Sequence, residues 1–247
     1  MTARIIKELK GFSGSEIYLM KENETLFVRK LGKIKRNTKK MISLGEQGFI
    51  VPKVYDYSRN RLDMEYVHGL DMKTYLTTHN TDHITHFLQE TFQKLSKDWE
   101  YKDYTDTYYT KLSQINFEEL PFSIDEIIDK APKKLPCSEY HGDLTLENIL
   151  YTTNGFVLID CVTTEYDSFI FDIAKLRQDL ELGWFNRYDP VNIQVKLLRM
   201  QKAIVRQHKL SKSNILLIIM LLRVYRYSKP NTLEREFLLR GIKKLWK

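Results

Sequence analysis

Three side chains in the middle of the sequence have the types and the spacing that phosphoryl transfer needs. Asp143 lies in a His-Gly-Asp turn, Asn148 follows five residues later, and Asp160 closes an apolar stretch. The reaction uses a carboxylate that accepts the proton of the attacking hydroxyl, and it uses carboxylate and amide oxygens that hold magnesium. The sequence therefore predicts Asp143 as the catalytic carboxylate, and Asn148 and Asp160 as ligands of Mg²⁺.

Two short strands must bring the two metal ligands together. Residues 149–151 and 156–159 are mostly apolar, and the segment 152–155 between them ends in Asn-Gly. Asn-Gly between two such runs is typical of a β-hairpin. Because Asn148 precedes the first strand and Asp160 follows the second, the hairpin places both at the same end.

Two further polar residues flank this core. Asp172 lies twelve residues beyond Asp160, at the start of a predicted helix. We expect it to anchor the His-Gly-Asp loop or to cap that helix. His141 is expected to hold the turn rather than to shuttle protons.

The N-terminal part of the chain predicts a site for nucleotide phosphates. Residues 4–10 and 15–21 flank a loop that contains Gly and Ser. Backbone N–H groups in such a loop can bind phosphate. Ser13 and Ser15 are the candidate contacts, and a plain hairpin turn is the alternative.

A cation is expected beside the phosphates at the end of the predicted strand 26–31. Successive side chains of a strand point to opposite faces, so only one of Arg29 and Lys30 can face a nucleotide. In kinases a Glu on the following helix pairs with this cation. Residues 36–44 contain no acid, so the partner is Glu46, lies elsewhere or is absent.

The strand predicted over residues 62–67 leads through His68-Gly69 into a helix, as a hinge between two lobes would. The backbone of such a hinge can bind the edge of an adenine. We take Glu65 and Val67 as the candidate contacts, with Met64 as an adaptable apolar wall. A connection without ligand is the alternative.

The remaining segments predict a mostly helical C-terminal part. Residues 71–98 have the apolar spacing of amphipathic helices. Residues 99–110 contain four Tyr and one Trp among acids; these rings either stack on a sugar, surround an ammonium group or pack between helices. Four more helical stretches are expected over residues 173–183, 190–208, 212–227 and 231–246.

The central motif, HGDLTLENIL followed by LID, resembles the catalytic core of the aminoglycoside phosphotransferase and choline kinase superfamily. The resemblance implies a catalytic base at Asp143, Mg²⁺ at Asn148 and Asp160, and ATP as phosphoryl donor. The spacing LFVR-x-x-G is similar to the corresponding strand of small-molecule kinases and favours Arg29 over Lys30. Thr145 stands where the family often has His, and Cys-Val-Thr follows Asp160 where protein kinases have Phe-Gly.

This resemblance also implies a fold and an activity. The expected fold is α+β, a two-lobed protein-kinase-like fold with a small β-rich lobe over residues 1–66 and a mostly helical lobe over residues 67–247. The expected reaction moves the γ-phosphoryl group of ATP to a hydroxyl of a small molecule. A sugar-like acceptor is favoured, because some bacterial relatives with HGDLT-type motifs look like kinases of capsule or surface glycans.

Two alternatives remain open. One is an atypical protein kinase, since HGDLT also resembles the small kinase of the tRNA-modifying KEOPS complex. The other is a non-catalytic pseudokinase that binds a nucleotide, which the missing acid at 36–44 favours.

Composition limits the partners. Of the 247 residues, the first 66 carry 14 Lys and Arg against 8 Asp and Glu, and this excess gives most of the net charge of +7. We interpret the basic cluster 33–40 as a solvated helix face near phosphates, so nucleic acid is not an expected partner. The longest apolar run, 215–222, is too short to span a bilayer. Two cysteines and the lack of a signal peptide predict a cytoplasmic protein.

Overall fold

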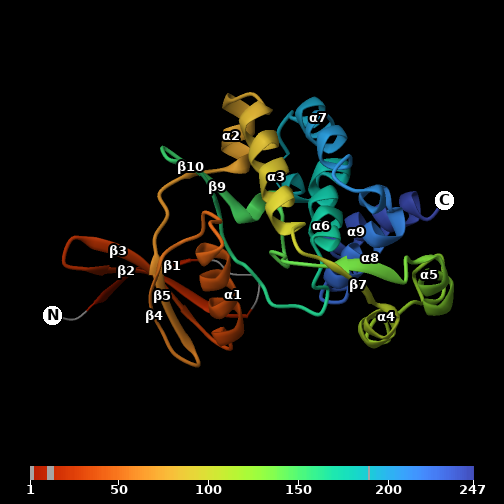
Figure 1. Ribbon diagram of the computed structural model, residues 1–247, viewed down its shortest axis with the longest axis horizontal. Coiled ribbons are helices and arrows are strands. Elements are labelled where there is room, and N and C mark those ends of the chain that lie inside the picture. Colours follow the sequence, from red (N-terminus) through yellow and green to blue (C-terminus); the bar gives the residue numbers. More distant parts are fainter. Residues whose placement is uncertain (1–2, 10–13, 189) are drawn as a thin grey trace. The chain divides into compact units, whose positions relative to one another are not determined.

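The computed structural model describes residues 3–9, 14–188 and 190–247, and the chain divides into two compact units (Figure 1). Unit 1 consists of Met1–Tyr75 and Glu147–Thr163, and unit 2 of Leu76–Leu146 and Thr164–Lys247. The lobes at residues 1–66 and 67–247 stay a prediction. The compact units differ from them because a second, later segment belongs to unit 1.

Unit 1 is built around a five-stranded antiparallel sheet with the strand order β1-β2-β3-β5-β4. Apolar and polar side chains alternate in β5, and the buried apolar residues of the sheet are Met20, Phe27, Val28 and Leu62. Helix α1 buries Thr38, Met41 and Leu44. The strands are β1 (Arg4–Leu9), β2 (Glu16–Glu22), β3 (Thr25–Leu31), β4 (Val54–Tyr57) and β5 (Arg61–Glu65), and α1 spans Lys35–Glu46.

A second sheet of unit 1, with the order β10-β9-β6, contains the predicted hairpin. Strands β9 (Ile149–Thr152) and β10 (Gly155–Leu158) pair antiparallel, and Leu158 lies opposite Ile149. Gly155 has a φ of 110°, which a glycine adopts at little cost. The hairpin is therefore confirmed. Strand β6 (Leu70–Asp71) pairs with β9 on its other side.

Unit 2 is mostly helical, and helices α6 and α8 form its centre. Residues 216–222 of α8 are all apolar and fully buried, as expected of a helix that is hydrophobic all round. The helices are α3 (Asp82–Leu95), α4 (Thr105–Leu112), α5 (Ile124–Lys130), α6 (Phe169–Leu182), α7 (Gln194–Ile204), α8 (Asn214–Tyr225) and α9 (Leu233–Leu245). Strands β7 (Glu100–Asp103) and β8 (Lys134–Cys137) pair antiparallel, and α2 (Met72–Thr78) begins in unit 1 and ends in unit 2.

Helix α6 has well-defined ends. The side chain of Ser168 accepts a hydrogen bond from the backbone N–H of Ile170 and caps the N-terminus. Gly183 ends the helix in a left-handed conformation, with a φ of 75°. All residues from Phe169 to Leu180 are buried, so α6 is enclosed by its neighbours in unit 2.

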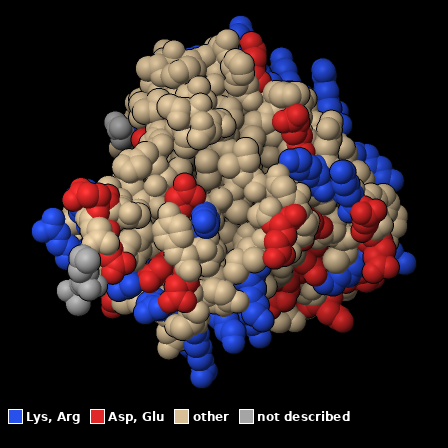
Figure 2. Space-filling view, turned by 60° about the vertical axis from the view of Figure 1, so that its left-hand side comes forward, with Lys and Arg blue, Asp and Glu red and all other residues tan. Residues whose placement is uncertain are grey.

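The predicted α+β class is confirmed. Among the residues that the structure describes, no helix combines the length and the apolar character needed to cross a membrane. In the basic cluster, Lys33, Lys35, Arg36 and Lys39 are exposed, and Lys40 is half-buried. On the face shown in Figure 2, Lys and Arg side chains lie among Asp and Glu side chains.

Candidate functional site

The hairpin of unit 1 brings the two predicted metal ligands to the same end, as expected. The backbone carbonyl of Asn148 accepts a hydrogen bond from the N–H of Ile159, at 3.0 Å, and Asp160 is the next residue. Asp160 has a φ of 55°, which is uncommon outside glycine, and its side chain is 44% exposed. Strained backbone of this kind is often found where a side chain has a function.

Lys30 joins these residues from the sheet of unit 1. Its Nζ donates a hydrogen bond to Oδ1 of Asp160 at 2.8 Å, and the Lys30 side chain is only 12% exposed. The site in unit 1 thus pairs one ammonium group with one carboxylate, and Asn148, which carries an amide, is bonded through its backbone to the residue before that carboxylate. These are suitable groups for the oxygens of a polyphosphate and for a hard metal ion.

Arg29 forms an ion pair with Asp63 of the neighbouring strand in the same sheet. It lies directly opposite Asp63 in the β3–β5 pair, and its Nε and Nη2 donate to the two carboxylate oxygens, both at 2.7 Å. These hydrogen bonds raise the pKa of Arg29 above its ordinary value. Phosphate contact by Arg29 stays a prediction, but the geometry favours Lys30, since Lys30 is the cation that reaches Asp160.

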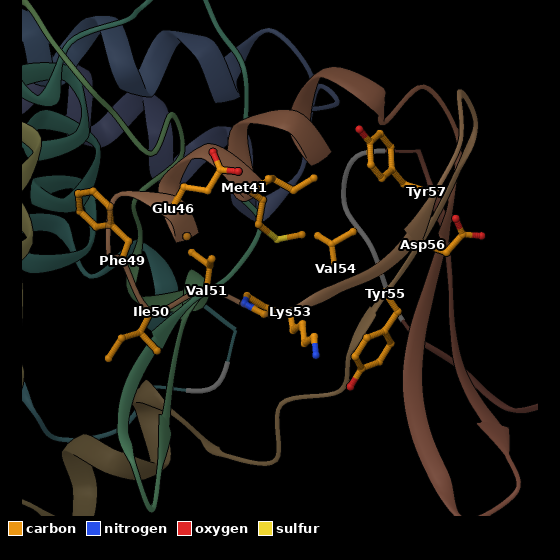
Figure 3. A pocket seen from close by; sticks show the side chains of 13 residues that line it. Met41, Glu46, Phe49, Ile50, Val51, Lys53, Val54, Tyr55, Asp56 and Tyr57 are labelled. Carbon is orange, nitrogen blue, oxygen red and sulfur yellow. The ribbon is translucent and has the colours of Figure 1, made fainter.

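Helix α1 provides no acidic partner for Lys30. Its one acid, Glu46, is exposed and lines an open pocket formed with β4 (Figure 3). Apart from Glu46, none of the predicted site residues that the structure describes lines that pocket. α1 instead contributes Asn37, whose Oδ1 accepts a hydrogen bond from the backbone N–H of Thr163. The partner of the strand cation is Asp160, which the sequence did not indicate.

The remaining predicted nucleotide contacts lie at other places in unit 1. Ser13 lies outside the described residues. Ser15 immediately precedes β2 and is half-buried next to Gly32. The backbone N–H of Glu65 donates to the carbonyl of Lys53 at 2.8 Å, so it is not available to an adenine. Val67 is half-buried after β5, and its predicted role stays a prediction, like that of Ser13, Ser15 and Glu65.

The His-Gly-Asp loop of unit 2 is held by Asp172. Its carboxylate accepts hydrogen bonds from the backbone N–H groups of His141, at 2.6 Å, and Gly142, at 2.8 Å. Gly142 has a φ of 89°, which favours glycine at this turn. His141 is fully buried. The expectation that Asp172 anchors the loop is confirmed.

Two cations surround Asp143 within unit 2, and the sequence predicted neither of them. Nζ of Lys175 lies 3.3 Å from Oδ1 of Asp143, and both terminal nitrogens of Arg223 donate to the carbonyl of Gly142 at 3.3 Å. Burial acts to raise the pKa of Asp143, but the charges of Lys175, Arg223 and His141 outweigh it, so the pKa lies below its ordinary value. The carboxylate is therefore ionised at neutral pH.

The aromatic stretch 99–110 divides into buried and exposed rings. Tyr104 and Tyr108 are fully buried in unit 2 and pack against Phe171. The exposed rings are Trp99, Tyr101 and Tyr109, at 42%, 52% and 43% exposure. Packing between helices thus accounts for two of the rings, and three remain accessible to a ligand.

Comparison with known proteins gives matches among solved structures. No protein-family model matches this sequence, and a search of curated proteins gives no match. The matches that were found are all to solved structures.

The similar structures are small-molecule kinases by name. A fructosamine-3-kinase candidate from Haemophilus somnus 129PT has a TM-score of 0.64 at 14% identity, covering 100% of this chain and 92% of its own. A thermostable mutant of the aminoglycoside phosphotransferase APH(4)-Ia has a TM-score of 0.67 at 9% identity, covering 99% and 94%. The ethanolamine kinase Pv091845 of Plasmodium vivax has a TM-score of 0.61 at 13% identity, covering 99% and 81%.

At these identities the likeness shows the fold. The chain has the kinase-like fold of aminoglycoside phosphotransferases and ethanolamine kinases, over essentially its whole length. This confirms the fold that the resemblance of the central motif implies.

Proposed function

We propose that this protein is an ATP- and Mg²⁺-dependent phosphotransferase that moves a γ-phosphoryl group to a hydroxyl of a small molecule. One observation carries the proposal. In unit 1, Lys30 lies 2.8 Å from Asp160, and Asn148 is hydrogen-bonded through its backbone to the residue before Asp160. A kinase-like fold supports it, since proteins with this fold include phosphotransferases by name.

The residues present fit magnesium and a nucleotide. Mg²⁺ prefers oxygen ligands and keeps several waters, so a carboxylate and an amide from the protein are enough. Asp160 and Asn148 would hold it, and Lys30 would contact phosphate oxygens. When bound, the metal neutralises charge on the transferring phosphates.

Asp143 would orient the acceptor and take its proton. The acceptor oxygen forms a bond to the γ-phosphorus, the bond from that phosphorus to the bridging oxygen breaks, and the electron pair leaves with ADP. The acceptor proton passes to the carboxylate of Asp143. The lowered pKa of Asp143 supports this role, since the group is ionised and able to accept a hydrogen bond from the hydroxyl.

A sugar-like acceptor is the substrate class that we propose. The exposed rings of Trp99, Tyr101 and Tyr109 in unit 2 support it, because aromatic faces pack well on sugars. The similar proteins carry the names of small-molecule kinases. A cytoplasmic location is part of the proposal and is supported by two free cysteines, Cys137 and Cys161.

Substitution of Asp143 tests the proposed function. Purified protein is incubated with Mg-ATP and a panel of sugars, aminoglycosides and amino alcohols, and ADP release and ³¹P NMR of the product report transfer. We expect Asp143→Ala to lower kcat by about 10²–10⁴-fold, because the positioned base is lost. ATP affinity should stay near that of the wild type. Asp129→Ala, at an exposed position of unit 2, is the matched control. Unchanged turnover in Asp143→Ala would contradict the proposal.

One observation favours a second candidate function. Helix α1 carries no acid at 36–44 that could pair with Lys30, as in a pseudokinase that binds nucleotide without transferring phosphate. A phosphotransferase transfers phosphate to an acceptor, and a pseudokinase does not. If Mg-ATP binds and wild-type transfer to every acceptor equals that of Asp143→Ala, the pseudokinase is the correct function.

A further inference from the structure

Two carboxylates on helix α6 hold the backbone of the loop that contains Asp143. Asp172 binds the N–H groups of His141 and Gly142. Asp179, two turns later and fully buried, accepts a hydrogen bond from the N–H of Leu146 at 2.7 Å. The loop is therefore fixed to α6 on both sides of its reactive residue.

Lys175 stands between these carboxylates on the same face of α6. Positions 172, 175 and 179 have the spacing i, i+3 and i+7, which places their side chains in one stripe along a helix. The two carboxylates of this stripe bind the loop backbone. Its one cation, Lys175, contacts the Asp143 side chain, with 3.3 Å from Nζ to Oδ1. The helix that shapes the loop thus also contacts its reactive group.

The exposed fractions of the two side chains show from which side Lys175 reaches Asp143. The Lys175 side chain is only 7% exposed, whereas that of Asp143 is 34% exposed. Lys175 therefore reaches Asp143 from the protein interior, and part of the Asp143 side chain stays exposed. A carboxylate has about four acceptor sites, so a hydrogen bond to Lys175 leaves room for an acceptor hydroxyl.

Two other groups near Asp143, Thr145 and Arg223, differ from Lys175 in what they contact. Thr145, two residues after Asp143, is uncharged and buried. Arg223, from α8, binds the Gly142 carbonyl and lies over the ring of Tyr166, with 5.4 Å from its Cζ to the ring centroid. Lys175 from α6, Arg223 from α8 and His141 from the loop itself each lower the pKa of the carboxylate. Of the three, Lys175 forms an ion pair with it.

We propose that Lys175 is a positioning residue of the phosphotransfer reaction, which holds the carboxylate of Asp143 in the orientation that receives the acceptor hydroxyl. The inference rests on the proposed function. Lys175 acts through Asp143 and does not touch the acceptor. Its charge also opposes the effect of burial, which by itself would raise the pKa of Asp143 and protonate the base.

Matched substitutions of Lys175 test this role. Lys175→Met removes the charge and keeps most of the length, and Lys175→Arg keeps the charge. Lys111→Met is the control, because Lys111 forms an ion pair with Glu165 in the same unit, at 2.8 Å. The pH dependence of kcat and the KM for ATP are measured for each variant.

We expect a specific pattern. Lys175→Met lowers kcat at neutral pH by about tenfold or more, because the base is poorly oriented, with KM for ATP within about twofold of wild type. The acidic limb of the pH profile moves to higher pH, since the pKa of Asp143 rises when its cation is lost. Lys175→Arg regains most of kcat, and Lys111→Met resembles the wild type.

Three results would overturn the inference. One is a profile whose acidic limb stays at the wild-type pH while the rate falls equally at all pH values. Another is a rise of KM for ATP in place of the fall in kcat, which would make Lys175 a phosphate ligand. The third is a Lys175→Arg variant as impaired as Lys175→Met.

A measurement without turnover keeps the inference testable if Lys175→Met does not fold or if the wild type transfers no phosphate. Carboxyl-¹³C NMR follows the titration of Asp143 in wild type and in the milder variant Lys175→Gln. We expect the titration to move to higher pH in Lys175→Gln. No movement would exclude the interaction. Absent transfer in a wild type that shows this movement would instead contradict the proposed function.

Discussion

At the scale of single residues, two neighbouring cations of one strand have different surroundings. Arg29 and Lys30 point to opposite faces of β3, so one pairs with Asp63 of the adjacent strand and the other with Asp160. The Arg29–Asp63 pair is bidentate, and the Asp63 side chain is only 11% exposed. We infer that Arg29 stabilises the sheet and that Lys30 serves the nucleotide.

This difference predicts opposite phenotypes for two substitutions. Lys30→Met removes a charge-assisted hydrogen bond to phosphate and should raise the KM for ATP by about 10–100-fold. Arg29→Met removes both 2.7 Å hydrogen bonds to Asp63 and leaves it the longer contact with Nε of Arg61, at 3.7 Å. It should lower the free energy of unfolding by about 1–3 kcal/mol, with little change in KM. Kinetics and urea denaturation measure the two effects. The reverse pattern would show that Arg29 is the phosphate ligand.

The reactive residue types were readable from the sequence, whereas their partners were not. Asp143, Asn148 and Asp160 are conspicuous because turns and a short hairpin connect them locally. The partners of Asp143 and Arg29 are distant in sequence. Lys175 follows Asp143 by 32 residues and Asp63 follows Arg29 by 34, so these pairs depend on helix packing and strand register. One signal was available: Lys175 is three residues after Asp172, on the same face of a predicted helix.

At the scale of elements, the hairpin is supported by a close contact with the chain before β6. A Cβ on Gly69 would lie 2.7 Å from the carbonyl oxygen of Tyr151 in β9. Only glycine allows this approach without movement of the backbone. The approach lets β6 pair with β9, the strand that begins directly after Asn148.

Gly69→Ala should therefore disturb the pairing of β6 with β9. We expect the free energy of unfolding to fall by about 1–3 kcal/mol, since the clash is with backbone. Gly45→Ala is the control. Its Cβ would meet only a methyl group of Val51, at 3.3 Å, and alanine is favoured over glycine in a helix by about 1 kcal/mol. Chemical denaturation compares the two variants, and equal stability of Gly69→Ala and wild type would refute the close contact.

Most elements were predictable in kind and approximate position. The helix expected after the strand 26–31, with the basic cluster 33–40 on it, corresponds to α1 (Lys35–Glu46), and the Asn-Gly hairpin is found where expected. Strand β1 (Arg4–Leu9) lies in the segment 4–10 that was expected to flank the Gly- and Ser-containing loop, although its adjacent and exposed Ile5 and Ile6 show no apolar alternation. The pairing of β6 with β9 joins segments about 80 residues apart, and nothing in the sequence of either segment predicts that they pair.

At the scale of the whole molecule, the chain returns to unit 1 after a long segment of unit 2. Residues Glu147–Thr163 belong to unit 1, and the N–H of Leu158 donates to the carbonyl of Ile50 at 2.9 Å. The predicted metal ligands and Lys30 are thus in one compact unit. Lobes at residues 1–66 and 67–247 would assign Glu147–Thr163 to the second lobe, whereas these residues belong to unit 1.

A ligand that binds these groups should stabilise the folded protein. We expect Mg-ATP to raise the melting temperature, by the equivalent of about 2.7 kcal/mol at a hundred times its Kd. ATP without magnesium should stabilise less, because its phosphates and the Asp160 carboxylate repel each other. Thermal denaturation with Mg-ATP, with ATP and EDTA, and with Mg²⁺ alone measures this difference. Asp160→Asn should reduce the effect of magnesium, and equal shifts with and without the metal would contradict the assigned ligands.

The stripe on α6 also has a consequence for when the loop takes its shape. The amides of His141, Gly142 and Leu146 are bonded to carboxylates that follow them by 31, 30 and 33 residues. During synthesis these amides leave the ribosome before their acceptors do. In the finished protein they are released together whenever α6 opens, so their hydrogen exchange should follow the opening of the helix. We therefore expect the loop amides of His141, Gly142 and Leu146 to exchange no more slowly and no faster than the amides of α6.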